Sequence, residues 1–253
     1  MGGDDMEGIG IDIGGSGVRI GRVDLATGEL LASPLRLEHT TDTPAATILE
    51  GLIAALSSFR EDLPLGLGFP GVVRGSVVET APNLGSTWPG TDLAVALNRP
   101  GLVVLNDADA AAVAEHRCGA SLGASGTIMT ITVGTGIGTA LHRDGVLVPN
   151  LELGLLAHPS RGGVIEAHAS GRARRQEGLS LTVWAERFQE ALHLYEGWLN
   201  PDLIVVGGGI TERWEEWAPL LTTKADLRRA QHGVDAGLVG AAFAAGSVKF
   251  MGQ

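Results

Sequence analysis

The chain has 253 residues, 44% hydrophobic and 19% charged, a composition with which a globular protein can bury a core in one large or two modest domains. A net charge of -11 argues against a nucleic-acid-binding surface, and no run reaches the roughly 20 apolar residues that cross a bilayer. The acidic start Met1–Glu7 is unlike a signal or transit peptide, and the single Cys118 excludes an internal disulfide and fits a reducing cytoplasm.

The first half of the chain predicts paired strands, a helix and further buried strands. Strands Gly8–Ile13 and Val18–Val23 flank a glycine-rich turn, and an extended run Glu29–Leu37 follows. Pro44 begins a helical segment, because apolar residues recur after it at helical spacing. The remaining predicted elements of this half are strand Leu65–Phe69, short helix Asp92–Leu97, strand Leu102–Leu105 and helix Asp107–Arg117.

The second half repeats this order, which predicts a duplicated α/β domain. Its expected elements are strands Gly126–Val133, Ile137–His142 and Val146–Val148, helix Leu181–Leu199, buried strand Leu203–Val206 and a packing helix Gly237–Gly246. We expect an N-terminal domain of residues 1–110 and a C-terminal domain of residues 111–235. The helix of about residues 236–253 is expected to pack back on the first domain, and the two halves are expected to enclose a cleft.

Three glycine-rich turns follow apolar strands, and each can offer backbone amides to phosphate because a glycine backbone allows close approach. A carboxylate before the first turn can hold a hydrated Mg²⁺. None of the turns has Walker A spacing, and the first leads into a strand, unlike a dinucleotide-binding turn. Tight hairpins without a ligand are the alternative. The phosphate-binding candidates are Asp12, Gly14, Gly15, Ser16 and Gly17, then Gly134, Thr135 and Gly136, then Gly208 and Gly209.

These turns resemble the phosphate and adenosine motifs of the superfamily that unites hexokinases, actin and the heat-shock ATPases. The resemblance rests on Ile11–Gly17, Val133–Gly138 and Ile204–Gly209. Within that superfamily the chain resembles the ROK (repressor–ORF–kinase) family, and its closest likeness is to the polyphosphate glucokinases. The segments that carry this likeness are Gly68–Val73, Ala81–Leu84, Asn106–Ala111, Gly178–Ser180 and Pro201–Ile204.

The resemblance implies an α/β fold of two ribonuclease-H-like domains around a central cleft. It also implies transfer of a phosphoryl group to the 6-hydroxyl of glucose, polyphosphate or ATP as donor, Mg²⁺ as cofactor and a homodimer. The alternatives are an ATP-dependent kinase for another hexose or amino sugar, a catalytically weak sugar-binding relative, and a sugar-sensing regulator. No helix-turn-helix precedes Gly8, which disfavours the regulator.

The candidate base is Asp107, because a carboxylate that ends a buried strand and opens a helix is well placed to take a proton from a bound hydroxyl. The resemblance gives it this role and implies that Asn83, Asn106, Glu152 and Glu166 bind the sugar. A helix N-cap is the alternative role for the aspartate, a turn former for Asn83, and a solvated surface position for each glutamate.

Several positions depart from the family pattern or remain open. Leu155 stands where the family has a sugar-binding histidine, and His158 is either a substitute for it or a surface residue. Arg19 replaces a lysine after the first turn, which keeps the charge and changes its geometry. A short basic cluster is either a solvated helix face or a contact for a long polyanionic donor; it consists of Arg172, Arg174 and Arg175.

Overall fold

The computed structural model describes residues 6–251, although not the side chains of residues 248–251, so most of the acidic segment Met1–Glu7 lies outside the described residues. The chain divides into two compact units. Unit 1 comprises Met1–Cys118 with Asp235–Gln253, and unit 2 comprises Gly119–Val234. The predicted domain boundary after residue 110 falls inside a helix, and all of that helix lies in unit 1 because it packs along the C-terminal helix.

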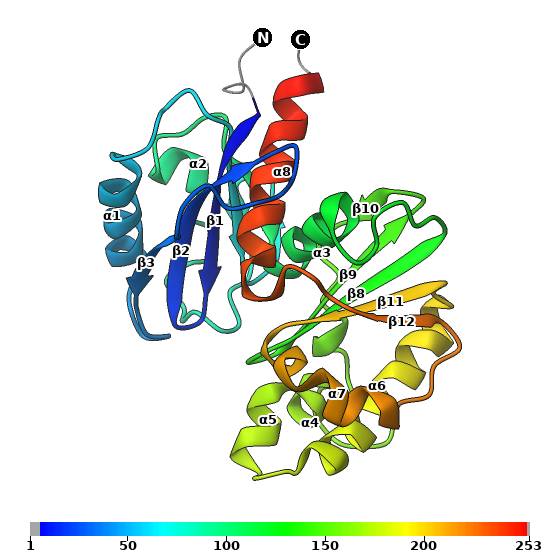
Figure 1. Cartoon of the computed structure of the whole chain (residues 1–253). Coiled ribbons are helices and arrows are strands. Elements are labelled where there is room, and N and C mark those ends of the chain that lie inside the picture. The colour runs from blue at the N-terminus through cyan, green and yellow to red at the C-terminus, as the bar shows by residue number, and fades with distance from the viewer. Residues whose placement is uncertain (1–5, 252–253) are drawn as a thin grey trace. The chain divides into compact units, whose positions relative to one another are not determined.

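Each unit contains a five-stranded sheet in which a three-strand antiparallel meander continues into two parallel strands (Figure 1). Unit 1 has the order β3-β2-β1-β4-β7, and unit 2 has the corresponding order β10-β9-β8-β11-β12. The predicted duplication is therefore confirmed. The strands of unit 1 are β1 Glu7–Gly14, β2 Gly17–Asp24, β3 Leu35–Glu38, β4 Leu65–Phe69 and β7 Val103–Asn106, with a separate pair β5 Val73–Arg74 and β6 Val77–Val78.

The strands of unit 2 are β8 Thr127–Val133, β9 Ile137–Arg143, β10 Val146–Val148, β11 Leu203–Gly207 and β12 Asp226–Arg229. The α-helices of unit 1 are α1 Ala45–Leu56, α2 Leu93–Ala96, α3 Asp107–Cys118 and α8 Ala236–Met251. Those of unit 2 are α4 Glu166–Ala169, α5 Gly171–Gln176, α6 Leu181–Leu199 and α7 Trp214–Trp217. Short 3-10 helices are η1 Leu153–Leu155, η2 Gly209–Arg213, η3 Ala218–Leu220 and η4 Gly233–Asp235. Within residues 6–251, no helix combines the length and hydropathy that a membrane span requires.

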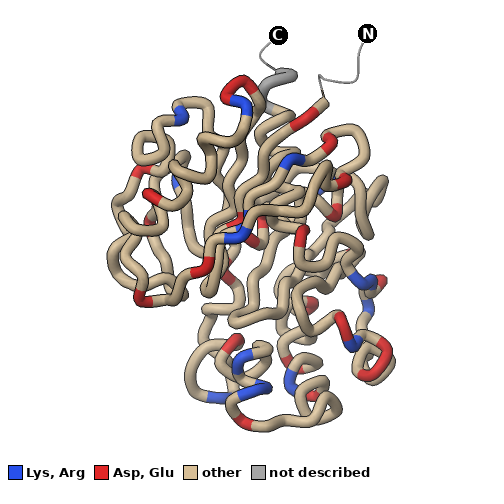
Figure 2. Tube along the Cα trace, turned by 60° about the vertical axis from the view of Figure 1, so that its left-hand side comes forward, with Lys and Arg blue, Asp and Glu red and all other residues tan. Residues whose placement is uncertain are grey.

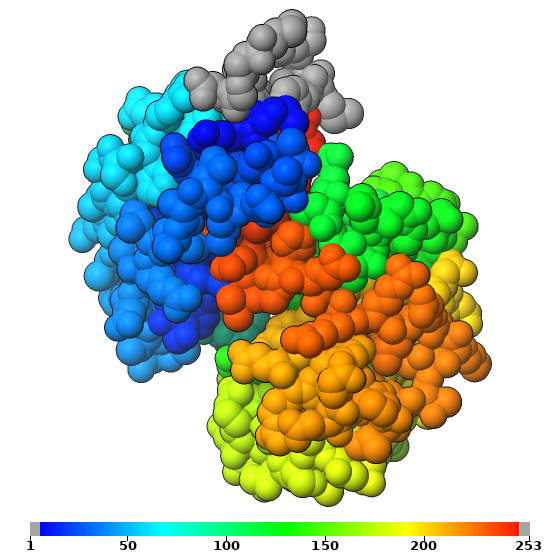
Figure 3. Space-filling view, in the orientation of Figure 1, coloured from blue at the N-terminus to red at the C-terminus, as the bar shows by residue number. Residues whose placement is uncertain are grey.

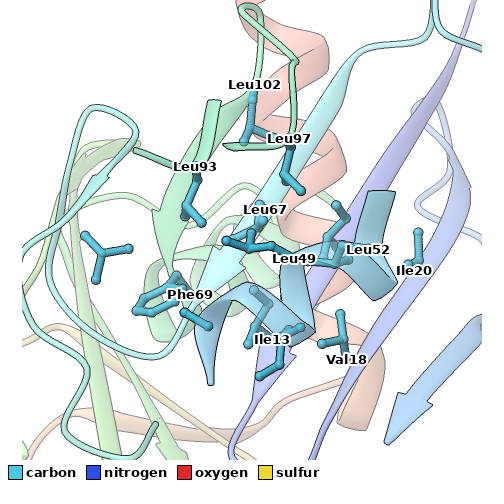
Figure 4. Close-up of a cluster of buried hydrophobic side chains, with 14 of the residues drawn as sticks. Ile13, Val18, Ile20, Leu49, Leu52, Leu67, Phe69, Leu93, Leu97 and Leu102 are labelled. Atoms are coloured by element: carbon cyan, nitrogen blue, oxygen red, sulfur yellow. The ribbon is translucent and has the colours of Figure 1, made fainter. Parts of the chain in front are cut away.

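Strand β1 directs alternate side chains to the two faces of its sheet. Ile9, Ile11 and Ile13 are buried in the core that also contains residues of α1 (Figure 4). The intervening residues face α8, and a Cβ added to Gly10 would lie 2.8 Å from the carbonyl carbon of Leu238. Figure 3 shows α8 in orange-red beside the blue strands of unit 1. Asp12 has the same parity as Gly10, so its side chain also points toward α8.

Helix α8 packs closely on strand β4 and helix α3, and at each contact one of the two elements has a glycine. A Cβ on Gly66 of β4 would lie 3.2 Å from Ala241 Cα and would overlap the carbonyl oxygen of that residue. A Cβ on Gly240 of α8 would lie 2.6 Å from the carbonyl carbon of Ala110 in α3. These glycines therefore allow backbone to approach backbone, and they set the position of the helix over the sheet.

The core of unit 2 is built around aromatic side chains of α6 and α7. Trp184 and Phe188 stack with ring centroids 5.0 Å apart, and Trp217 meets the Trp184 ring edge-on at 5.1 Å. Trp184 Nε1 donates a hydrogen bond of 2.8 Å to the carbonyl oxygen of Ala169. The long helix thus holds the end of α4 through a buried polar contact as well as through packing.

Candidate functional site

Strands β1, β4 and β7 run parallel, so their carboxyl ends meet at one edge of the unit 1 sheet, where ligands of open α/β sheets bind. Asp12 pairs in register with Gly68 of β4. A Cβ placed on Gly68 would lie 3.7 Å from Asp107 Cα and 3.7 Å from Asp12 Oδ1. The two predicted carboxylate positions, 95 residues apart in the chain, are therefore neighbours over a residue that has no side chain.

Asn106 caps helix α3. Its Oδ1 accepts hydrogen bonds from the N–H groups of Ala108 at 2.9 Å and Asp109 at 3.2 Å, and its Nδ2 donates to the carbonyl oxygen of Gly71 at 3.2 Å. This is the capping role that the sequence left open for Asp107. Asp107 forms the first helical residue, where its Oδ1 also accepts a hydrogen bond of 2.8 Å from the N–H of Ala108 and the positive end of the helix dipole stabilises its negative charge.

The Asp12 carboxylate belongs to a charged group of three side chains. Arg19 places its guanidinium between two carboxylates, 2.6 Å from Asp12 Oδ2 and 3.0 Å from Asp235 Oδ1. The arginine fork suits such a bridge better than a lysine would. Burial raises the pKa of Asp12 above its ordinary 3.8, Arg19 opposes that shift, and Asp235 adds to it. A Cβ on Gly237 would lie 2.6 Å from Asp12 Oδ1, so the start of α8 is packed directly on this carboxylate.

The first glycine turn is the two-residue loop of the β1–β2 hairpin, in which Gly14 pairs with Gly17. Ser16 is exposed at its tip. A Cβ on Gly15 would lie 3.7 Å from the carbonyl oxygen of Asn83, in ordinary contact. Asn83 itself lies in a turn closed by the hydrogen bond from Leu84 N–H to the Ala81 carbonyl at 3.1 Å. The structure thus brings the first turn close to the Asn83 loop.

The second and third glycine turns adjoin one another in unit 2, because β8 and β11 are parallel neighbours. The second turn closes the β8–β9 hairpin, and its Gly134 and Thr135 are exposed. Gly208 has a φ of +85°, and a Cβ on it would lie 2.8 Å from the carbonyl carbon of Val133, so this position requires glycine. The third turn continues into the 3-10 helix η2, in which the Thr211 hydroxyl donates to the Gly208 carbonyl at 2.8 Å.

Glu166 lies against the second glycine turn. Its Oε2 accepts a hydrogen bond of 3.0 Å from the N–H of Ile137, and a Cβ on Gly136 would lie 3.2 Å from its Cδ. Arg172 is 3.6 Å from its other oxygen. The side chain is therefore not a solvated surface group, and its contact with the turn spans 29 residues of sequence.

The segment that carries Glu152 is fixed on β9 by the hydroxyl of Thr139. That hydroxyl accepts a hydrogen bond of 3.1 Å from the N–H of Leu153 and donates one to the carbonyl oxygen of Leu151. A Cβ on Gly154 would lie 3.2 Å from the carbonyl carbon of Ile137. The Glu166 side chain and the backbone on either side of Glu152 are thus both held by the first residues of β9. Sequence reasoning missed Thr139, whose role depends on contacts that no motif spacing reveals.

Comparison with known proteins agrees with this architecture. The sequence profile described as "ROK family" matches residues 8–149, more than half of the chain. The chain belongs to the ROK family. The polyphosphate glucokinase of Mycobacterium leprae (strain TN) is 37% identical over 241 residues, which cover 94% of this chain and 74% of that protein.

Two solved kinase structures share the fold. The inorganic polyphosphate/ATP-glucomannokinase from Arthrobacter sp. strain KM is 39% identical, with a TM-score of 0.85 over 96% of this chain and 99% of that one. A ROK family glucokinase from Streptomyces griseus, solved in complex with glucose and AMPPNP, is 26% identical, with a TM-score of 0.74 over 94% of this chain and 99% of that one. The fold is that of the actin and hexokinase superfamily, as the motifs predicted.

This ROK chain departs from the family pattern at Leu155, and His158 is the candidate substitute three residues further along the chain. Leu155 is half-buried in η1. The side chain of His158 is 5% exposed, so the expectation of a surface residue is wrong. Its Nδ1 accepts from the N–H of Ser160 at 3.3 Å, its Nε2 lies 3.7 Å from Glu190, and its ring meets the edge of His168 with centroids 5.3 Å apart.

We predict that His158 makes the stability of unit 2 depend on pH. Burial lowers its pKa below the ordinary 6.5, as do the nearby charges of His168 and Arg161, while Glu190 opposes the shift. Below pH 6.5 the unfolded chain therefore binds a proton that the folded chain resists, and the free energy of unfolding falls as the pH decreases. Urea unfolding at pH 7.5, 6.5 and 5.5 measures this fall.

The control for this prediction is His158→Leu, which removes the titrating group and keeps an apolar side chain. The difference between the two proteins isolates His158 from Asp12, whose raised pKa acts in the opposite direction. Equal pH dependence in wild type and variant would show that the ring accepts a proton without cost.

Proposed function

We propose that the chain transfers a phosphoryl group from inorganic polyphosphate or ATP to the 6-hydroxyl of glucose. The observation that carries this proposal is the meeting of Asp107 and Asp12 over Gly68, at the edge of unit 1 where the first glycine turn lies. The names and identities of the polyphosphate glucokinase and glucomannokinase relatives support the substrates. Phosphoryl transfer requires a positioned hydroxyl, a base and neutralised charge, and the chain has candidates for each.

In the proposed reaction, the Asp107 carboxylate accepts the proton of the 6-hydroxyl while that oxygen bonds to the terminal phosphorus of the donor. The bond between this phosphorus and the bridging oxygen breaks, and the shortened polyphosphate or ADP leaves with the bond electrons. Asn106 positions the base by capping α3. We assign contacts with the other sugar hydroxyls to Asn83, Asn106, Glu152 and Glu166, since carboxylates and amides suit a polyol.

We assign the donor phosphates to the glycine turns, with Gly14, Gly15, Ser16 and Gly17 in unit 1 and Gly134, Thr135, Gly136, Gly208 and Gly209 in unit 2. The surroundings of Asp12 fit Mg²⁺, which takes one or two carboxylates and completes its shell with water and phosphate oxygens. Arg19 binds Asp12 Oδ2 and Gly237 packs against Oδ1, so the carboxylate would hold Mg²⁺ through water molecules and not by a direct bond. When bound there, Mg²⁺ neutralises charge on the transferring phosphates.

A second candidate acceptor is mannose or another hexose. The observation that favours it is Leu155, which removes a hydrogen-bonding side chain where the family pattern has histidine. Loss of one such bond costs about 0.5–1.5 kcal/mol of binding and leaves the base in place. The relative from Arthrobacter is called a glucomannokinase, which is consistent with relaxed discrimination among hexoses. We further propose a cytoplasmic homodimer, on the strength of the family resemblance.

The proposed function predicts turnover in a matrix of sugars and donors. Purified protein is assayed with glucose, mannose, fructose and N-acetylglucosamine, each with polyphosphate or ATP and with Mg²⁺ or EDTA. We expect glucose to be phosphorylated on the 6-oxygen at a kcat of about 1–10³ s⁻¹ and EDTA to abolish the reaction. Phosphorus–proton coupling in the product identifies the oxygen. Failure of every sugar with both donors would leave a sugar-binding relative without activity.

A further inference from the structure

Unit 2 contains a hollow of about 190 Å³ between its second and third glycine turns. It is smaller than the pockets of about 300–1,000 Å³ that bury drug-sized ligands. Its lining is partly apolar and partly charged. The charged residues are Arg174, Arg175, Glu212 and Arg213, and the others include Val133, Gly134, Gly209 and Ile210.

Close backbone packing brings the arginines of α5 to this hollow. A Cβ on Gly171 would lie 2.7 Å from the carbonyl oxygen of Gly134 and 3.4 Å from Arg175 Nη1, so the guanidinium lies close to the second turn. The Ser170 hydroxyl accepts from the N–H of Ala173 at 3.1 Å and fixes the start of the helix. Arg174 is half-buried and Arg175 is exposed, so the cluster lies partly against the second turn and partly toward solvent. In Figure 2, several basic positions gather at the lower end of unit 2.

Ion pairs with carboxylates distinguish Arg172 and Arg213 from Arg174 and Arg175. Arg213 is bound to Glu216, and Arg172 lies 3.6 Å from Glu166. Within the part of the chain that the structure describes, Arg174 and Arg175 have no carboxylate within 4.0 Å, and the buried Nε of Arg174 makes no hydrogen bond. In a chain of net charge -11, two arginines that form no ion pair within 4.0 Å and line one hollow indicate an anionic ligand, although Glu212 shares that hollow and Glu216 feels the charge of Arg174.

We propose that Arg174 and Arg175 bind the phosphates of inorganic polyphosphate that lie beyond the transferred one, and so favour this donor over ATP. The inference rests on the proposed function and names the donor specificity of the same site. Planar guanidinium groups bind phosphate through paired, charge-assisted hydrogen bonds. Adenosine is uncharged and bulky, so it gains less from two guanidinium groups in a hollow of this size. Glu212 is the opposing charge, and it weakens the polyanion's binding.

The test compares wild type with the double variant Arg174→Gln/Arg175→Gln. We expect KM for long-chain polyphosphate to rise by about 10- to 100-fold, as for the loss of charge-assisted hydrogen bonds, and KM for ATP to change little. The slope of log(kcat/KM) for polyphosphate against log[salt] should become shallower by about one for each phosphate that an arginine no longer neutralises. Arg143→Gln, at the other end of β9, removes a charge of the same sign and should leave both donors unaffected.

Binding without turnover separates this inference from the proposed function. The rise in unfolding temperature that polyphosphate causes should be smaller in the double variant, and the rise that ATP causes should be retained. If the wild type phosphorylates no sugar, this measurement still decides the role of the arginines. Glu212→Gln should lower KM for polyphosphate. Equal weakening of both donors by the arginine variants, or weaker ATP binding in Glu212→Gln with polyphosphate unchanged, would overturn the assignment.

Discussion

Replacement of Asp107 by asparagine is expected to lower kcat for glucose phosphorylation by about 10²- to 10⁴-fold, the contribution typical of a general base. The amide keeps the shape of the side chain and can still contact a hydroxyl, but it cannot take the proton. KM for glucose should therefore change little. The unfolding temperature should also change little, because Asn106 supplies the cap of α3. Steady-state kinetics measures kcat and KM, and thermal unfolding measures the unfolding temperature.

The matched control is Asp92→Ala, in the same unit. Asp92 caps α2 by accepting from the N–H groups of Ala94 at 3.1 Å and Val95 at 3.2 Å. Its loss should cost about 0.5–2 kcal/mol of stability and leave kcat unchanged. Asp107→Asn should thus lose activity and keep its stability, whereas Asp92→Ala should lose stability and keep its activity. A rate near wild type in Asp107→Asn would mean that another group takes the proton, and the proposed reaction would lose its base.

The elements that were predictable have strong local patterns. Helix Leu181–Leu199 and strand Leu65–Phe69 have the predicted bounds, because their apolar periodicity and flanking turns are visible within a short window. Strand β12 was missed, since Asp226–Arg229 is a charged edge strand, most of whose residues are exposed. Its existence follows from the duplicated topology, in which it corresponds to β7 of unit 1.

The candidate site likewise has residues that the sequence predicted and contacts that it did not. Motifs identified the residues that bear chemistry, such as Asp107 and the glycine turns, because these have fixed local spacing. They did not reveal which polar groups hold them, because those contacts join distant segments. The hydrogen bond from Ile137 to Glu166 and the Arg19 bridge to Asp235 are examples. Whether an arginine has a carboxylate partner is a property of the folded chain, so the basic cluster stayed ambiguous until Arg174 and Arg175 were located.

Gly240→Ala is expected to destabilise unit 1 by about 1–3 kcal/mol or more, the usual cost of overpacking. The added methyl group would lie 2.6 Å from the carbonyl carbon of Ala110 and 3.0 Å from the backbone nitrogen of Ala114, and neither backbone atom can move without shifting α3. Thermal and urea unfolding measure the loss, with a fall in Tm of about 2–4 °C for each kcal/mol.

The control is the same substitution in a helix where the methyl group meets nothing. Gly197 lies within α6, and apart from its chain neighbours and the backbone of its own helix no atom falls within 4 Å of its added Cβ. Gly197→Ala should therefore stabilise the protein by about 0.5–1 kcal/mol, since alanine is the better helix former. Opposite signs for one chemical change would identify close packing as the cause. A neutral or stabilising Gly240→Ala would mean that α8 can separate from α3 at no cost.

Gly240→Ala should lose more activity than its loss of stability explains. One turn before Gly240, Gly237 packs on the Asp12 carboxylate, and α3 begins with Asp107. Moving α8 away from α3 therefore alters the surroundings of both carboxylates at the edge of the sheet. We expect kcat to fall at temperatures where the variant is still folded, and the Mg²⁺ concentration needed for half-maximal rate to rise. If the folded variant keeps its kcat and its Mg²⁺ requirement, the packing of α8 is needed for stability alone, and the arrangement of Asp12 does not depend on it.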